Sequence, residues 1–132
     1  MSLPNLIHGV IPYLTVIGAA KAIDFYKAAF AAIEHDRRPT EDGRLMHGHL
    51  EINNGSLMLS DAFPEHGYPH QPSISFTMTL MVEDAQLWWD RAVAAGCEIR
   101  MPLDVQFWGD TYGQLTDPFG VGWAINQPAA KA

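Results

Sequence analysis

The order in which sequence patterns recur limits the folds open to this 132-residue chain more than any other feature. One helical pattern of apolar residues spans 19–32 and a second spans 85–95. When the two are compared along the numbering, Ala22 corresponds to Ala85 at an offset of 63, and Gly55 corresponds to Gly120 at an offset of 65. Strand patterns precede and follow each helix in the same order. The sequence therefore predicts two copies of one βαβββ unit.

The first copy is predicted over residues 9–61. β-Branched and aromatic residues at 10–16 favour a strand, and Pro12 suits the start of that strand because proline cannot donate to a central ladder. The helix at 19–32 has one apolar stripe to bury. Three short strands are predicted after it at 34–38, 44–52 and 56–61, separated by the turn sequences Glu41-Asp-Gly43 and Asn53-Asn-Gly55.

The second copy is predicted over residues 73–127, after a linker at 62–72 that contains three prolines. Its strands are expected at 73–82, 97–101, 107–115 and 121–126, with the helix at 85–95. Asp84 is the predicted N-cap of that helix, and Gly96 suits the left-handed position that ends it. We expect a single α+β domain over 1–132, with one helix covering one face of each mixed, curved sheet. The uncovered faces, side by side or shared between subunits, would form a concave cleft.

Charge and cysteine content exclude several classes of partner. With 8 basic and 15 acidic residues, the net charge of -7 repels phosphate backbones and anionic lipid, so we expect no nucleic acid and no membrane surface as a partner. No apolar run approaches the roughly 18 residues that span a bilayer. The one cysteine, Cys97, cannot form a bridge within the chain, which favours a cytoplasmic location. A small organic molecule is the expected partner.

Three segments carry a resemblance to known proteins. The first is the helical run Ala22-Ile-Asp-Phe-Tyr-Lys-Ala-Ala-Phe30, and the others are 47–61 and 107–120, which ends in Asp-Pro-Phe-Gly. The helical run resembles the first-helix signature of the glyoxalase/bleomycin-resistance (vicinal oxygen chelate) superfamily, and the other two look like its PhnB-like branch. The resemblance covers 10–126 and implies a homodimer with a concave site. Val121-Gly122 stands where many members of the branch have a histidine, so no role of that histidine carries over.

The resemblance also implies where a metal would be held. Metal-using members of the superfamily place four ligands, drawn from His, Glu or Gln, on the first and last strands of each unit, where a divalent ion polarises vicinal substrate oxygens. The first-strand ligand lies five residues before the valine that ends the strand, which gives Ile11 and Thr77. The last-strand ligand lies four residues after the turn glycine, which gives Leu59 and Ala124. None of these is a usual ligand, and their neighbours supply no carboxylate or imidazole. We therefore expect no metal and no other cofactor.

The best alternative metal site is the strand motif of His47, His49 and Glu51. Residues two apart on a strand share a face, so these side chains are predicted to point the same way, and their donors could hold Zn, Fe or Ni. His47 and Glu51 would lie about 13 Å apart on an extended strand, so at most two adjacent members could bind one ion. The other interpretation is a polar strip in which a hydrogen bond holds His47.

Alternation along the strands predicts which side chains line the cleft. If the four counted positions face inward, the candidate ligand-binding residues are Tyr13, Thr15, His47, Asp61, Thr77, Thr79, Trp108, Asp110 and Tyr112. Trp108, Asp110 and Tyr112 would form a rim suited to a flat or cationic organic molecule. His66 and His70 are assigned to a solvated loop in the linker.

These observations favour a metal-independent small-molecule-binding protein of the PhnB-like branch, of a sequestering or resistance type. Two alternatives stay open. One is a divalent-metal-dependent lyase, isomerase or ring-cleaving dioxygenase on the same fold. The other is an acid/base enzyme without metal, with Asp61 or Asp110 as the general base and Tyr112 as the proton donor.

Overall fold

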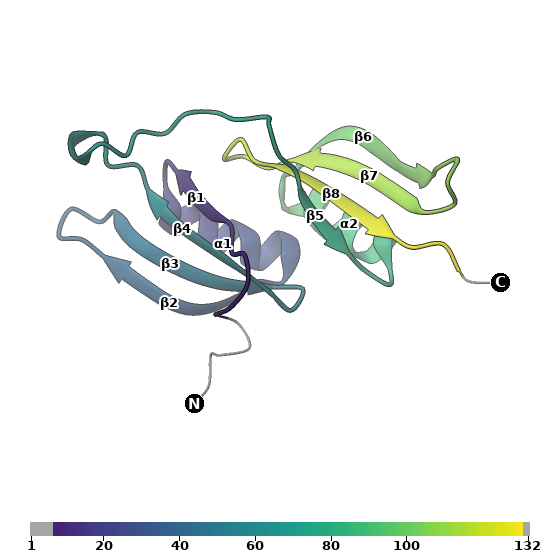
Figure 1. The fold of residues 1–132 in the computed structure, drawn as a ribbon, viewed down its shortest axis with the longest axis horizontal. Coiled ribbons are helices and arrows are strands. Elements are labelled where there is room, and N and C mark those ends of the chain that lie inside the picture. The colour runs from purple at the N-terminus through teal and green to yellow at the C-terminus, as the bar shows by residue number, and fades with distance from the viewer. Residues whose placement is uncertain (1–6, 131–132) are drawn as a thin grey trace. The chain divides into compact units, whose positions relative to one another are not determined.

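The computed structural model of the chain describes residues 7–130 and separates it into two compact units, residues 1–71 and residues 72–132. Each unit is a four-stranded sheet with one helix (Figure 1). The α+β class and the repeated βαβββ order are therefore confirmed. The division falls at the end of the predicted linker, which belongs to the first unit by its contacts.

The first unit has the strand order β1-β4-β3-β2, in which β1 and β4 are parallel and the other neighbours are antiparallel. Its elements are β1 (Tyr13–Val16), α1 (Ala19–Phe30), β2 (Ile33–Pro39), β3 (Leu45–Ile52), β4 (Gly55–Asp61) and the short 3-10 helix η1 (Pro64–His66). β1 begins later than predicted, after Pro12, which has no backbone N–H but still accepts a hydrogen bond from the Met58 amide at 3.0 Å. α1 ends at Phe30 because Ala31 adopts a left-handed conformation (φ 53°).

The second unit has the strand order β5-β8-β7-β6. Its elements are β5 (Met78–Met81), α2 (Ala85–Ala95), β6 (Glu98–Val105), β7 (Thr111–Thr116) and β8 (Gly122–Gln127). The predicted cap of α2 is confirmed, since the Asp84 side chain accepts a hydrogen bond from the Leu87 amide at 3.1 Å. Gly96 ends the helix with a φ of 122°. Of the predicted strand at 73–82, only the last part forms, and β7 begins at Thr111 because residues 106–110 form a turn.

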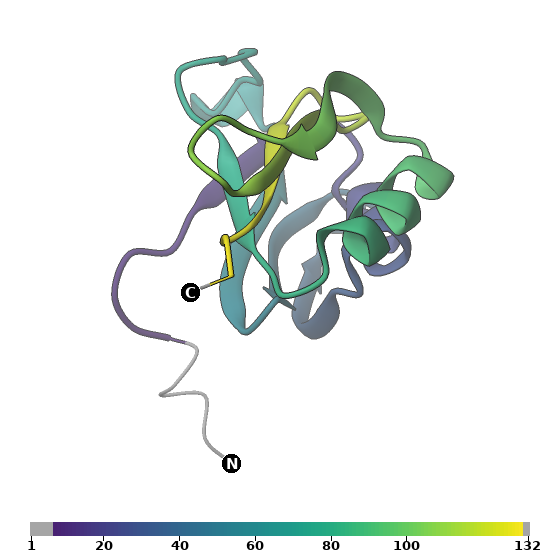
Figure 2. The ribbon, with the colours of Figure 1, turned by 90° about the vertical axis from the view of Figure 1, so that its right-hand side faces the viewer.

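Each helix packs on one face of its own sheet, as the turned view shows for α2 (Figure 2), and we call the face away from the helix the open face of that sheet. In the first unit Ile23 and Tyr26 of α1 are fully buried. A Cβ added to Gly48 of β3 would lie 3.1 Å from the Ile23 side chain, so Gly48 faces the helix. In the second unit the corresponding contact is closer, because an added Cβ on Gly113 of β7 would lie 2.6 Å from the Trp89 ring. Within the described residues no helix is long and apolar enough to cross a bilayer.

The two helices begin at Ala19 and Ala85, which are 66 positions apart. The offset of 63 from the sequence is therefore shifted by almost one helical turn. Both alignments match the buried Tyr26 to a buried residue, Trp89 at an offset of 63 and Ala92 at 66, because residues three or four apart lie on the same helix face. Apolar spacing alone cannot separate them, whereas the strand ladder can: the pair Leu14–Leu59 in one sheet corresponds to Leu80–Ile125 in the other.

Asp61, at the end of β4, does not face the open side of the sheet as its assignment to the cleft requires. It is 6% exposed, and its Oδ1 accepts hydrogen bonds from the Gly18 and Ala19 amides at 2.8 and 3.0 Å. Its Oδ2 accepts from the Leu45 amide at 2.7 Å. The carboxylate therefore joins the first turn of α1 to two strands. Gln127 has the corresponding place in the second unit, where its Oε1 accepts from the Ala85 amide at 2.9 Å.

Candidate functional site

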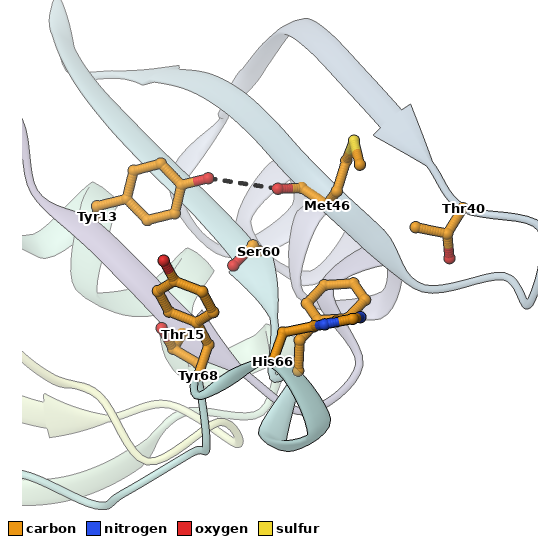
Figure 3. A pocket seen from close by; sticks show the side chains of 8 residues that line it. Tyr13, Thr15, Thr40, Met46, Ser60, His66 and Tyr68 are labelled. Carbon is orange, nitrogen blue, oxygen red and sulfur yellow. Dashed lines mark hydrogen bonds between the residues drawn. The ribbon is translucent and has the colours of Figure 1, made fainter.

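A pocket of about 530 Å³ lies on the open face of the first sheet (Figure 3). Its lining comes from three strands, the β2–β3 turn and the segment that follows β4. The eight lining residues are Tyr13, Thr15, Thr40, Met46, Ser60, Phe63, His66 and Tyr68. All of them belong to the first unit, so the whole pocket is built by one βαβββ copy and its linker.

The floor of the pocket is set by strand register. In the parallel ladder of β1 and β4, Thr15 is paired with Ser60 and Tyr13 with Met58, so alternate side chains of both strands share the open face. Met46 reaches the same face through a bulge. Its neighbours Leu45 and His47 pair with consecutive residues of β2, which leaves Met46 unpaired between them. The Met46 side chain is 56% exposed and lines the pocket.

One wall of the pocket is residues 62–70, which we call the wall segment. Phe63 and Tyr68 exchange two backbone hydrogen bonds of 2.7 and 2.9 Å, closing a small loop around η1. Gly67 makes this loop possible because it adopts a left-handed conformation (φ 86°). The far end of the segment is held by His70, whose Nδ1 donates to the Thr15 carbonyl at 3.0 Å. The linker is thus ordered against the sheet, and His70 is not a freely solvated residue.

Arg44 anchors the near end of the wall segment. Its guanidinium lies 2.6 Å from Glu65 and 2.8 Å from Asp42, and stacks 4.2 Å above the centroid of the Phe63 ring. It also donates to the Ala62 carbonyl at 3.3 Å. The Arg44 hydrogen bond lowers the pKa of Glu65 to about 2, so both carboxylates stay ionised and together neutralise the arginine charge with one negative charge to spare.

Tyr13 places its hydroxyl at a junction of polar groups. The hydroxyl oxygen lies 3.0 Å from Nδ1 of His47 and 3.5 Å from the Met46 carbonyl. Burial raises the pKa of Tyr13 above its usual value, against smaller opposite effects of the Ser60 hydrogen bond and the Arg38 charge. The phenol is therefore neutral at physiological pH and can donate a proton in a hydrogen bond. The sequence assigned Tyr13, Thr15 and His47 to one site; Tyr13 and Thr15 line the pocket, and His47 contacts Tyr13 without being one of the lining residues.

The histidine motif on β3 forms a polar strip with separate partners. His47 contacts Tyr13, and Nε2 of His49 lies 2.9 Å from the Ser56 hydroxyl. Glu51 accepts a hydrogen bond of 2.9 Å from His35. Among residues 7–130, no group of three or more His, Cys, Asp or Glu side chains is arranged to hold a metal ion.

His49 should make stability depend on pH. Desolvation lowers its pKa below 6.5, with further lowering by the neighbouring His35 and His47 charges and a smaller opposite effect of Asp36 and Glu51. Below pH 6.5 the unfolded chain gains a proton at this residue that the folded chain does not. The free energy of unfolding should therefore decrease as the pH is lowered from 6.5 to the pKa of His49 in the folded chain. Urea unfolding between pH 8 and pH 5 should show a shallower acid slope for His49→Gln than for the wild type. An unchanged slope would contradict this assignment.

The four positions counted for a metal do not share one face. Gly48 pairs with Leu59, so Leu59 points at α1, and the open-face residues next to it are Met58 and Ser60. Ala124, in contrast, lies on the open face of its sheet, since its neighbour Ile125 pairs with the helix-facing Gly113. Turn length explains the difference: two residues separate Ile52 from Gly55, whereas three separate the paired residues Asp117 and Val121. Neither set supplies the donors of a divalent-metal site, so the side chains present do not fit the metal that the superfamily resemblance implies.

The remaining predicted site residues lie in the second unit. Thr77 precedes β5 and Thr79 lies within it, both exposed. Trp108 makes an edge contact with Tyr112, with ring centroids 5.9 Å apart, and the Tyr112 hydroxyl accepts from Gln114. Asp110 accepts hydrogen bonds from the Ala129 amide at 2.8 Å and from Asn126 at 3.1 Å.

The bonds of Asp110 and Asp61 do not favour a general base. The Ala129 amide, followed by Asn126, lowers the pKa of Asp110, and Asp61 is fully engaged with backbone amides. The other reactive side chain, Cys97, is buried, and burial followed by the Asp117 charge raises its pKa to about 12. It acts as a small apolar residue, not a nucleophile.

Several pocket residues were not predicted from the sequence. Ser60 takes the place in the pocket that was expected for the next residue, Asp61. Met46 faces the pocket only because of a bulge. Phe63, His66 and Tyr68 lie in the linker. Their signal was the clustering of two aromatic residues and a histidine in a segment that otherwise consists of loop-forming residues.

The repeated βαβββ fold, with a mixed ladder and one open face in each unit, is that of a glyoxalase-like protein. The sequence model of the Glyoxalase/Bleomycin resistance protein/Dioxygenase superfamily matches residues 7–125. The chain belongs to this superfamily. An uncharacterized protein of Mycobacterium bovis is 40% identical over 126 residues, which cover 91% of this chain and 83% of the relative.

Solved structures agree with this assignment. Protein PA1353 from Pseudomonas aeruginosa is 26% identical with a TM-score of 0.76, covering 93% of this chain and 99% of the other. The PhnB protein from Bacillus cereus, described as a putative 3-demethylubiquinone-9 3-methyltransferase, is 20% identical with a TM-score of 0.68, covering 92% and 100%. At that identity the likeness concerns the fold, and it places a PhnB protein among the structural neighbours, as the sequence resemblance predicted.

Proposed function

We propose that this protein binds a small organic molecule in the pocket of the first unit and does so without a metal ion. The observation that carries the proposal is the lining of the pocket. None of its eight residues has a carboxylate, ammonium or guanidinium group, and three are aromatic. A volume of about 530 Å³ lies within the usual range of ligand pockets, and an apolar lining with a few hydroxyls is their usual composition. Binding of a sequestering or resistance type needs nothing more than this.

Metal-dependent chemistry receives less support from the side chains. The four positions implied by the superfamily supply no metal donors, and His47, His49 and Glu51 each have another hydrogen-bond partner. Metal analysis of the purified protein tests this part of the proposal. One tightly held divalent ion per chain would favour the lyase, isomerase or dioxygenase alternative instead.

A variant that fills the pocket should abolish ligand binding. In Ser60→Phe, the new ring would occupy the space between Thr15 and the wall segment. In a thermal-shift screen, neutral aromatic compounds should raise the melting temperature of the wild type, since a ligand that prefers the folded state stabilises it, and should leave Ser60→Phe unshifted. Divalent metal salts should shift neither protein.

The matched control is Thr79→Phe, which adds the same ring to the open face of the second sheet. This variant should respond to aromatic compounds like the wild type. If Thr79→Phe loses the response and Ser60→Phe keeps it, the ligand binds in the second unit and the pocket has been assigned to the wrong copy.

We further propose that the protein is a cytoplasmic homodimer. The superfamily resemblance supports the dimer, and a single, buried cysteine suits a reducing compartment. Light scattering coupled to size-exclusion chromatography should give twice the mass of one chain. A monomeric mass would remove the dimer from the proposal and leave the pocket of the first unit unaffected.

A further inference from the structure

We propose that Tyr13 makes the pocket selective for neutral, planar aromatic molecules that carry a carbonyl-type oxygen, with the phenol donating a hydrogen bond to that oxygen. This inference rests on the proposed function and specifies the ligand class of the same pocket. It assigns to Tyr13 a specificity-determining role and to His47 a positioning role.

The first step concerns the proton of the Tyr13 hydroxyl. Nδ1 of His47 lies 3.0 Å and the Met46 carbonyl 3.5 Å from the hydroxyl oxygen. The Ser60 hydroxyl, which donates its own proton to the Asp61 carbonyl at 3.1 Å, also interacts with the Tyr13 hydroxyl. When His47 donates from Nδ1, the phenol oxygen accepts that proton and its own proton has the Met46 carbonyl as acceptor. A distance of 3.5 Å is long for an O–H···O bond, whose usual length is about 2.7–2.8 Å. A ligand oxygen at normal distance would therefore be a better acceptor than the Met46 carbonyl.

The second step concerns the form of the ligand. The Phe63 and His66 rings lie with centroids 6.4 Å apart in the wall segment, and Tyr68 adds a third ring on the same wall. In the close view the rings of Tyr13, His66 and Tyr68 lie around the open space (Figure 3), and Phe63 also lines it. Aromatic side chains bind flat apolar molecules through stacked and edge contacts.

The third step concerns charge. Arg44, which contacts the wall segment, is paired with both Glu65 and Asp42, so its positive charge is fully neutralised and is not available to an anionic ligand. None of the lining residues is a carboxylate that could hold a cation. A charged ligand would leave water without receiving a partner of opposite charge, which is costly. The combination of rings, the Tyr13 phenol proton and a lining without carboxylate, ammonium or guanidinium groups fits a neutral aromatic carbonyl compound.

The experiment compares two probes of similar size on the full chain. Coumarin is a neutral bicyclic aromatic molecule with a carbonyl oxygen, and naphthalene has a similar ring system without an acceptor. Dissociation constants are measured for the wild type and for Tyr13→Phe. The variant should bind coumarin about tenfold more weakly, equivalent to about 1.4 kcal/mol, and should bind naphthalene within about twofold of the wild type. Since Tyr13 is half-exposed, phenylalanine should leave the fold intact, which circular dichroism checks.

Two further variants sharpen the test. Tyr68→Phe removes another phenol of the same pocket and should change both affinities by less than about twofold. His47→Leu removes the group that orients the Tyr13 oxygen and should weaken coumarin binding about threefold without affecting naphthalene. If Tyr68→Phe shows the coumarin-specific loss instead of Tyr13→Phe, the assignment of the donor is overturned.

The remaining outcomes separate this inference from the proposed function. If coumarin and naphthalene both bind the wild type, and Tyr13→Phe weakens neither or both equally, the selectivity is overturned while the binding pocket stands. If neither probe binds the wild type and no neutral aromatic compound shifts its melting temperature, both the inference and the proposed function are overturned.

Discussion

Replacing Asp61 with alanine is expected to lower the free energy of unfolding by about 3–5 kcal/mol, although the residue lies one position from the pocket. The carboxylate is 6% exposed and accepts hydrogen bonds from the amides of Gly18, Ala19 and Leu45. Hydrogen bonds to a charged group contribute more than neutral ones, and buried amides without a partner carry a desolvation cost. Urea unfolding of the two proteins measures the difference.

Gln127→Ala is the matched control, because Gln127 has the equivalent place in the second unit but accepts only the Ala85 amide in the contacts described. Its expected cost is about 1 kcal/mol, the usual net value of one neutral hydrogen bond. Asp61→Asn, which keeps the size of the side chain without its charge, should fall between the two. Equal, small losses for Asp61→Ala and Gln127→Ala would show that the three-amide junction is not important for stability.

Gly113→Ala should cost about 2–3 kcal/mol, the range typical of overpacking a core. An added Cβ would lie 2.6 Å and 2.8 Å from two atoms of the Trp89 ring and 2.9 Å from the Leu103 Cα. Since the Leu103 Cα is backbone, β6 must shift, and the Trp89 ring of α2 must move as well. Chemical denaturation followed by circular dichroism measures the loss.

Gly48→Ala is the control for this substitution, because Gly48 occupies the same place in the first sheet. Its added Cβ would lie 3.1 Å from side-chain atoms of Ile23 and Leu59. Both are flexible side chains that can move, so the expected cost is below about 1 kcal/mol. The double variant Gly113→Ala/Trp89→Phe should lose less stability than the sum of the losses of the two single variants, and the difference is the coupling energy between the two positions. If Gly48→Ala is the more damaging of the two, our account of helix packing is wrong.

The fold could be predicted because its signals are local. The switch from helical to alternating spacing identified the order of elements in both copies, and short-range chemistry identified the ends of α2, with Asp84 at one and Gly96 at the other. Lengths were less predictable where strand formation depends on a partner. Residues 73–77 have strand-forming composition, but in the structure β5 pairs with β8 only from Met78.

The candidate site could be predicted only in part, because it depends on register. Tyr13, Thr15 and His47 follow directly from alternation on strands whose phase was correct. Asp61 and Ser60 exchanged roles because a one-residue difference in turn length reverses the faces of the following strand. Neither the apolar spacing of the helices nor the glycines of the turns reveals that difference, since an alignment shifted by one helical turn satisfies the same pattern of burial.

The wall segment was the least predictable part of the site. Its position follows from Arg44 and His70, which contact residues far away in the sequence. A local reading of prolines and glycine correctly gave an irregular segment, but could not show that it turns back over β1 and β4. The same holds for Met46, whose direction depends on the pairing of β2 with β3.

Phe63 and Tyr68 close the wall segment with their own backbone bonds, and the three residues of η1 and Gly67 between them bury no side chain in the core. This part of the pocket wall is thus separate from the buried core of the first unit. An engineer could exchange His66, while keeping Gly67 for the turn and Glu65 for the contact with Arg44, and test new ligands on an unchanged scaffold. The same independence would let natural selection diversify what the pocket accepts without rebuilding the sheet beneath it.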